Sequence, residues 1–191
     1  MEKSSKVIIV GGLAGVGKTT VLNKLYNRLT DEGKKFHVFV YGTVMLEEAE
    51  RLGVKDRDEM RNLSFESQKE LQVRAARKIA ADGITFIDTH YMIPTPYGYL
   101  PGLPAHVLAE LKPTHLVLLL ADPSEIIRRR MNDLTRKRET KNEADINYEI
   151  QLSRIMVGAA SMLTGAIIVE IYNRENMLEQ TVEELIKKLE L

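Results

Sequence analysis

One eight-residue string constrains the fold of this chain more than any other feature. Residues 12–19 read GLAGVGKT, which fits G-x-x-x-x-G-K-[ST] without a mismatch. The string follows the β-branched run Val7–Val10, which predicts a strand. It precedes a segment in which Leu22, Leu25 and Leu29 share one helical face. Strand, glycine-rich loop and helix together predict a loop whose backbone N–H groups converge on a phosphate at a helix N-terminus.

This loop indicates binding of a nucleoside triphosphate with Mg²⁺. We expect Lys18 to reach the β- and γ-phosphates and the Thr19 hydroxyl to ligate the metal. The residues expected to bind the triphosphate are Gly12, Leu13, Ala14, Gly15, Val16, Gly17, Lys18, Thr19 and Thr20. The alternative is a glycine-rich turn that contains Lys-Thr by chance, but both the string and its context argue against it.

Two aspartates that follow apolar strands are candidates for the metal site. Asp122 precedes Pro123 and a helical pattern, so capping of that helix explains it. Asp88 has no helix to cap, because Thr89, His90 and a segment rich in Pro and Gly follow it. We therefore expect Asp88, acting through water, rather than Asp122 beside the Mg²⁺ ion.

Apolar runs alternate with helical patterns along the whole chain. We expect strands at 7–10, 36–41, 84–87, 115–120 and 166–171. We expect helices at 19–32, 44–52, 64–82, 105–111, 123–138 and 177–189, and a further helix that follows the polar stretch at 139–143 and ends at 163. We expect an irregular stretch at 88–104. This order predicts a single α/β domain over 1–191, with a five-stranded parallel sheet flanked by helices.

Composition excludes several classes of protein. The 27 Lys and Arg residues balance 27 Asp and Glu residues, so no general attraction to DNA or to anionic membranes is expected. The absence of cysteine excludes disulfides and thiolate chemistry. No apolar run approaches the ~20 residues that span a bilayer. The first residues lack a signal-peptide pattern, so a cytoplasmic location is expected.

Two groups of arginines could bind further phosphates. The first contains Arg128, Arg129, Arg130, Arg136 and Arg138, and the second contains Arg57 and Arg61 one helical turn apart. Arginine forks match phosphate oxygens, and phosphoryl transfer between two polyanions needs several cations. A solvated basic helix face for the first group, and a ladder of salt bridges for the second, remain open alternatives.

The segment before 163 carries an apolar face formed by Leu152, Ile155, Met156, Ala159 and Leu163. This face could pack on the protein's own sheet or on a neighbouring subunit, and the pattern alone favours neither.

Taken together, these residues resemble the archaeal-type adenylate kinases over essentially the whole chain. The resemblance includes the loop at 12–19 and the strings YGTVM at 41–45, DRDEMR at 56–61 and DTH at 88–90. It continues through TPYGYLPGLP at 95–104, through Arg129 and DLTRKR at 133–138, and through Arg154 and LTG at 163–165.

The resemblance implies the reaction ATP + AMP ⇌ 2 ADP with Mg²⁺ and the nucleoside-monophosphate-kinase fold. It implies an AMP-binding segment at about 42–83, a short arginine-rich lid at about 128–142, and a homotrimer. Lys18, Asp88, Arg129, Arg136 and Arg138 would be catalytic, and Thr43, Arg57, Arg61, His90 and Arg154 would bind AMP.

The chain departs from this family at a few positions. Ala14 stands where many relatives have Pro, and Gly11 stands where they have Thr. We expect these two changes to alter only the stiffness of the loop. Tyr91 and Met92 replace smaller residues and lie close to the expected monophosphate pocket.

Two other functions remain open at this point. One is a kinase for another acceptor, such as CMP, UMP or a molecule without phosphate, although Arg57 and Arg61 argue against the last. The other is a nucleoside-triphosphatase switch or assembly factor with adenylate-kinase ancestry.

Overall fold

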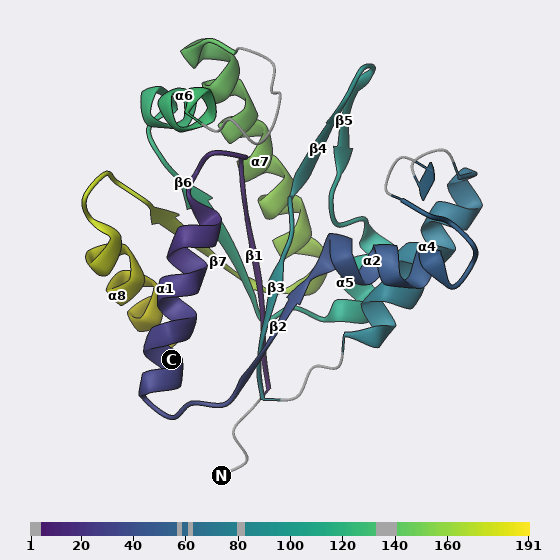
Figure 1. Ribbon diagram of the computed structural model, residues 1–191, viewed down its shortest axis with the longest axis horizontal. Helices are drawn as coiled ribbons and strands as arrows, with labels where there is room; N and C mark the ends of the chain where they lie inside the picture. Colours follow the sequence, from purple (N-terminus) through teal and green to yellow (C-terminus); the bar gives the residue numbers. More distant parts are fainter. Residues whose placement is uncertain (1–4, 57–58, 61–62, 80–82, 133–140) are drawn as a thin grey trace.

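The computed structural model describes residues 5–56, 59–60, 63–79, 83–132 and 141–191 (Figure 1). Its centre is a parallel sheet with the strand order β2-β3-β1-β6-β7. The strands are β1 (Lys6–Gly12), β2 (Phe36–Val40), β3 (Ile84–Asp88), β6 (His115–Leu120) and β7 (Ile167–Tyr172). The predicted five-stranded parallel sheet is confirmed.

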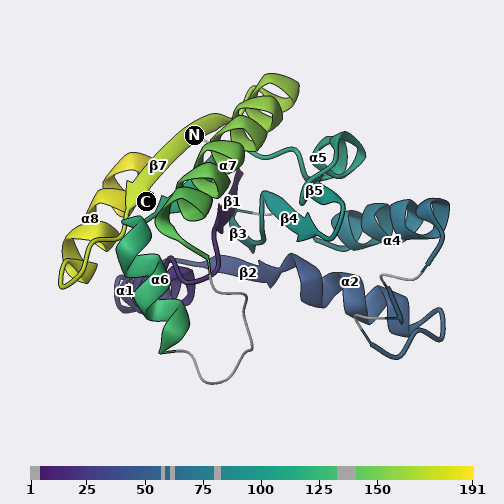
Figure 2. The ribbon, with the colours of Figure 1, turned by 90° about the horizontal axis from the view of Figure 1, so that it is seen from above.

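Helices cover both faces of this sheet. Figure 2 shows α1 and α8 on one face and α5 and α7 on the other, while α2 and α4 extend beyond β2. Their bounds are α1 (Lys18–Asp31), α2 (Tyr41–Glu50), α4 (Phe65–Lys78), α5 (Ala105–Leu111), α6 (Pro123–Met131), α7 (Glu143–Thr164) and α8 (Leu178–Leu189). None of the helices in the described ranges is both long and apolar enough to cross a bilayer.

The central strands explain why the apolar runs are continuous rather than alternating. Every residue of β6 is buried, as are the six residues Val7–Gly12 of β1, because helices cover both of their faces. In the register of the sheet, Val10 lies opposite Asp88 and Gly12 lies opposite Leu119. The carboxyl ends of β1, β3 and β6 therefore meet where the phosphate-loop motif begins.

The stretch expected to be irregular contains a β-hairpin, so that prediction was wrong. β4 (Met92–Thr95) pairs with β5 (Gly98–Pro101) in antiparallel register. Prolines suit such a two-stranded ribbon because each strand has an outer edge that needs no donor. The Thr95 hydroxyl closes the turn: it donates to the Gly98 carbonyl at 3.0 Å and accepts from Tyr97 N–H at 3.3 Å.

Several predicted boundaries also shift. β2 ends at Val40 and α2 begins at Tyr41, whose buried hydroxyl donates to the Gln72 carbonyl of α4 at 2.9 Å. The predicted strand to 41 and helix from 44 were therefore misplaced by up to three residues. The helix expected over 123–138 is α6, and residues 133–138 lie outside the described residues, as do 80–82 of the helix expected over 64–82.

The face of α7 that contacts the protein's own core differs from the apolar face read in the sequence. The buried residues of α7 are Ile146, Glu149, Ile150, Ser153, Val157 and Ala160. Ile155 and Leu163, from the predicted face, are 65% and 64% exposed. Packing of the whole predicted face on the protein's own sheet is therefore excluded, although Leu152 and Met156 are partly buried against the core.

Candidate active site

The loop between β1 and α1 has the backbone conformation that anion binding requires. Gly15 and Gly17 have φ of 90° and 88°, a region that side chains with a Cβ rarely adopt. α1 starts at Lys18 with Gly17 at its N-cap, which offers no side-chain oxygen, and its first turn carries no acidic residue. The first N–H groups of α1 and its positive dipole end are thus left for an anion.

Side chains from outside the loop bond its carbonyl oxygens. Arg130 Nε donates to the Ala14 carbonyl at 2.7 Å, and Arg129 Nη1 donates to the Val16 carbonyl at 3.1 Å. The amide of Asn173, at the end of β7, donates to the same Val16 carbonyl at 2.8 Å. These bonds fix the loop from α6 and β7 and so pre-organise it.

Asn173 was missed by sequence reasoning. Its only sequence signal is its place: it follows β7, at the edge of the sheet where the loop lies. Asn173 is buried, and a Cβ at Gly17 would lie 2.4 Å from its Nδ2 atom. Arg129, in contrast, was predicted as a site residue and does contact the loop.

Lys18 lies beside Asp88. Its ammonium group donates to an Asp88 carboxylate oxygen and, at 2.8 Å, to the Thr89 carbonyl. Their side chains are 12% and 21% exposed, so the pair is shielded but reachable. Asp122 occupies the N-cap position of α6, yet its side chain makes no capping bond, so capping does not explain it as expected.

The residues around the loop fit a magnesium–nucleotide complex. No group of three or more His, Asp or Glu side chains that could bind a metal exists in the described ranges. Mg²⁺ with a nucleotide needs only one or two protein oxygens, because phosphates and water supply the rest. The exposed Thr19 on the first turn of α1 and the partly exposed Asp88 offer such oxygens.

Two of the predicted AMP ligands lie at the carboxyl ends of the strands. Thr43 is exposed on the first turn of α2, directly after β2, and His90 is exposed two residues after β3. Gly102 packs its backbone against the His90 carbonyl, and a Cβ on Gly102 would lie 1.7 Å from that oxygen. The foot of the hairpin therefore holds the His90 backbone in place.

Arg154, another predicted AMP ligand, is bonded to residues of β7. Its guanidinium makes two hydrogen bonds to the Glu170 carboxylate, at 2.7 and 3.0 Å, and one to the Tyr172 hydroxyl at 2.7 Å. These partners raise the pKa of Arg154 further above its usual value, chiefly through the bonds to Glu170. The other predicted phosphate-binding arginines, Arg57, Arg61, Arg136 and Arg138, lie outside the described residues.

Gly11 and Tyr91 form a matched pair beneath the loop. A Cβ on Gly11 would lie 2.4 Å from a carbon of the Tyr91 ring. Tyr91 is fully buried, and its hydroxyl lies 3.1 Å from the Ile9 carbonyl and 3.2 Å from the Val117 carbonyl. Burial raises the pKa of Tyr91, so this hydroxyl stays protonated as a donor. Gly11 thus makes room for an aromatic ring and does more than alter the stiffness of the loop.

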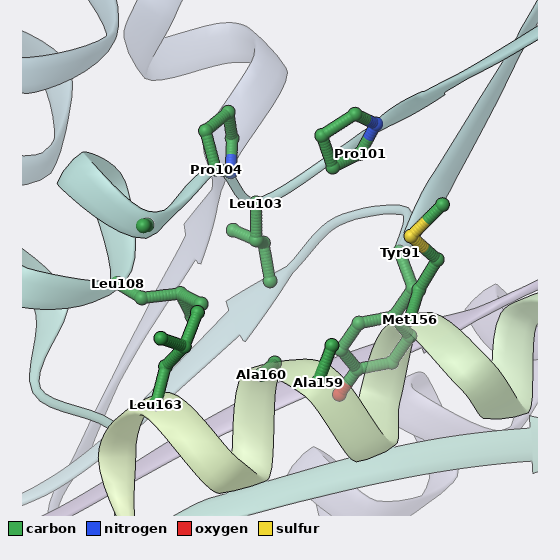
Figure 3. A pocket seen from close by; sticks show the side chains of 10 residues that line it. Tyr91, Pro101, Leu103, Pro104, Leu108, Met156, Ala159, Ala160 and Leu163 are labelled. Atoms are coloured by element: carbon green, nitrogen blue, oxygen red, sulfur yellow. The ribbon is translucent and has the colours of Figure 1, made fainter.

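A hollow lies between α5, α7 and the foot of the hairpin (Figure 3). It has a volume of about 200 Å³ and is almost entirely apolar. The residues that line it are Tyr91, Pro101, Leu103, Pro104, Ala105, Leu108, Met156, Ala159, Ala160 and Leu163. It offers nothing to hold a phosphate and is distinct in character from the loop.

The fold and the loop define a class of protein. A phosphate loop at the carboxyl edge of a five-stranded parallel sheet, with its lysine beside a strand-end aspartate, is the arrangement of the P-loop nucleotide-binding proteins. A family profile described as "AAA domain" matches residues 11–147. The solved shikimate kinase from Bacteroides thetaiotaomicron superimposes with a TM-score of 0.60 at 16% identity, over 98% of this chain and 100% of that chain. At this identity the likeness shows the fold alone.

Curated relatives identify the family within this class. The adenylate kinase of Methanocaldococcus jannaschii is 43% identical over 189 residues, which cover 97% of this chain and 98% of the relative. The adenylate kinase of Saccharolobus solfataricus is 43% identical over 96% of this chain and 99% of its own. The adenylate kinase of Pyrococcus furiosus is 42% identical, and the match covers 97% of this chain and 95% of the relative. The chain belongs to the adenylate kinase family and is a phosphotransferase, which confirms the resemblance to the archaeal type.

Proposed function

We propose that the protein catalyses the reversible, Mg²⁺-dependent reaction ATP + AMP ⇌ 2 ADP. The observation that carries the proposal is the pre-organised loop, with its carbonyls bonded from outside and Lys18 beside Asp88. Full-length similarity to adenylate kinases supports the choice of ATP and AMP as substrates. We assign ATP binding to residues 12–20.

Phosphoryl transfer in such a site depends on position and charge. A phosphate oxygen of AMP attacks the γ-phosphorus in line, and ADP leaves on the opposite side, so no covalent enzyme intermediate is needed. Lys18 exchanges its bonds to Asp88 and Thr89 for phosphate oxygens when ATP binds. The loop N–H groups and the start of α1 stabilise the negative charge of the triphosphate.

We assign the remaining roles by position in the family. The segment at about 42–83, with Thr43, Arg57 and Arg61, binds AMP together with His90 and Arg154. Arg129, Arg136 and Arg138, all within the arginine-rich segment at about 128–142, neutralise the transferring phosphate and exclude water. For Arg154 this role requires the guanidinium to leave Glu170 and Tyr172, because its contacts in this structure are to β7.

Mg²⁺ would be held by the Thr19 hydroxyl directly and by Asp88 through water. When bound, the ion neutralises charge on the β- and γ-phosphates and orients them. Asp88 would serve this ion and also accepts a hydrogen bond from Lys18.

Substitution of Lys18 tests the phosphate-binding role. Lys18→Ala should abolish ADP formation from ATP and AMP while leaving the thermal unfolding midpoint close to that of the wild type. The matched control is Lys24→Ala, which removes a lysine from the same helix that pairs with Glu179 on α8. Near-normal turnover by Lys18→Ala would contradict the proposed site.

We further propose that the protein is a homotrimer. Ile155 and Met162 on α7 and Ile167 and Ile168 on β7 are large, apolar and well exposed, and Met162 is 90% exposed. The apolar hollow of Figure 3 opens beside Leu163 on the same helix. Exposed apolar residues and an apolar hollow on the same helix suit head-to-tail contacts between copies of this chain, and such contacts can close into a ring.

Sedimentation equilibrium tests this assembly. The wild type should sediment at three times the chain mass, and Met162→Lys should shift it toward the monomer because a charge is costly to bury at an interface. Monomeric wild-type protein at micromolar concentration would refute the trimer. We also propose that the enzyme acts in the cytoplasm, which cell fractionation can test.

A further inference from the structure

One buried carboxylate near the loop has no role in the scheme above. Glu149 lies on the buried face of α7, and its side chain is 5% exposed. Burial of a charge costs free energy unless partners compensate it. Glu149 has two cationic partners: Lys141 Nζ lies 2.5 Å from its Oε1 atom, and Arg130 Nη2 lies 3.7 Å from its Oε2 atom.

Arg130 connects this carboxylate to the phosphate loop. While Nη2 faces Glu149, Nε of the same guanidinium donates to the Ala14 carbonyl at 2.7 Å. The stem of Arg130 also packs on the loop, since a Cβ at Gly15 would lie 3.0 Å from its Cγ atom. The Arg130 side chain is 12% exposed, so the path from Glu149 to the loop is largely shielded from water.

We propose that Glu149 is a positioning residue for the phosphate loop and that it acts through Arg130. The carboxylate fixes one edge of the guanidinium, which orients Nε toward the Ala14 carbonyl. The Ala14–Gly15 peptide is thereby held in the orientation that suits the triphosphate. The inference deepens the proposed function, on which it rests, because it takes ATP as the ligand of this loop.

An amide at position 149 cannot replace the carboxylate. Lys141 and Arg130 use different oxygens of Glu149, whereas a glutamine has one oxygen and an NH₂ group that only donates. Glu149→Gln keeps the shape of the side chain but removes the Glu149 oxygen that one of the two cations contacts. Of the two contacts to Glu149, the one from Arg130 is the longer, at 3.7 Å, and so is the one expected to be lost.

The first experiment compares nucleotide affinities by titration calorimetry of the full-length protein. Glu149→Gln should raise the dissociation constant for MgATP about fivefold, because the lost contact is an ion pair at 3.7 Å rather than a short hydrogen bond, and that for AMP less than about twofold. Glu143→Gln is the matched control, since it removes an exposed carboxylate from the first turn of the same helix and changes the net charge equally. A merely structural salt bridge would weaken both nucleotides alike or neither.

A double-mutant cycle then tests the path through Arg130. Lysine at position 130 cannot serve both Glu149 and the Ala14 carbonyl as a guanidinium does. Arg130→Lys should weaken MgATP binding, and Glu149→Gln should add little in the Arg130→Lys background. Additive effects, or MgATP affinity in Glu149→Gln within about twofold of that in Glu143→Gln, would overturn the inference.

Failure of the proposed function and failure of a variant to fold can both be distinguished from failure of the inference. If the wild type itself does not bind MgATP, the proposed function fails, whatever Glu149 does. If Glu149→Gln does not fold, Glu149→Asp replaces it, because the shorter side chain keeps the charge but withdraws from Arg130. MgATP affinity equal to that of the wild type in the Asp variant would then overturn the inference.

Discussion

Replacement of Gly11 by alanine should destabilise the protein through a clash with the Tyr91 ring. This clash can be removed separately by substitution of Tyr91. The new Cβ would lie 2.4 and 2.5 Å from two carbons of the Tyr91 ring. The ring has little freedom to withdraw, because Tyr91 is fully buried and its hydroxyl is held near the Ile9 and Val117 carbonyls. Gly11 does not have a positive φ, so the cost is steric rather than conformational.

The magnitude follows from overpacking. Extra carbon atoms in a well-packed core cost about 1–3 kcal/mol, and the short contacts with a tethered ring place Gly11→Ala near 3 kcal/mol. For a chain of this size, that loss lowers the unfolding midpoint by roughly 6–12 °C. Tyr91→Ala alone should cost about 3–5 kcal/mol, because it leaves a cavity.

The two substitutions should not be additive. In a Tyr91→Ala background the clash is absent, so Gly11→Ala should cost less than about 0.5 kcal/mol or even stabilise by partly filling the cavity. In a Tyr91→Phe background the ring remains, so Gly11→Ala should cost as much as in the wild type. Urea unfolding of the single and double variants measures the free energy of unfolding of each, and hence the cost of Gly11→Ala in each background. Equal costs of Gly11→Ala in the wild-type and Tyr91→Ala backgrounds would refute the reasoning.

Two further predictions concern the loop and the arginine-rich segment. Asn173→Ala removes the amide that donates to the Val16 carbonyl at 2.8 Å, and the KM for ATP should rise roughly tenfold with that for AMP unchanged in steady-state kinetics. Equal effects on both substrates would contradict this loop-specific role. Arg136→Ala should lower kcat far more than it weakens ATP binding. Steady-state kinetics measures kcat, and titration calorimetry measures the affinity for ATP. An unchanged kcat would indicate that Arg136 lies on a solvated surface and has no catalytic role.

The sequence predicted most of the sheet and the phosphate loop because both depend on local patterns. A continuous β-branched run such as Val7–Val10 is typical of a strand buried on both faces, and the glycines at 15 and 17 permit the positive φ that the loop adopts. The hairpin at Met92–Pro101 escaped prediction because prolines mask a two-stranded ribbon, whose edges tolerate them.

Contacts between distant residues could not be predicted from local patterns. Asn173 reaches Val16, and the Tyr91 ring packs against Gly11, only because the fold brings the residue after β7 and the residue before β4 close to the end of β1. For a related reason, the sequence left open whether the apolar face of α7 meets the core. Its buried side carries Glu149 and Ser153, which look like surface residues, while Ile155 and Met162 are exposed. Apolar periodicity alone does not distinguish a core face from a subunit interface.

The most direct test of the proposed reaction is the rate of ADP formation by the purified protein with MgATP and a panel of acceptors. The panel contains AMP, CMP, UMP, GMP and no acceptor, each with and without Mg²⁺. We predict rapid formation of two ADP per AMP consumed, which stops when Mg²⁺ is removed. Preference for another monophosphate would contradict the assigned acceptor but keep the phosphoryl transfer. Slow release of ADP that is independent of any acceptor would contradict the kinase reaction itself and indicate a nucleoside-triphosphatase switch.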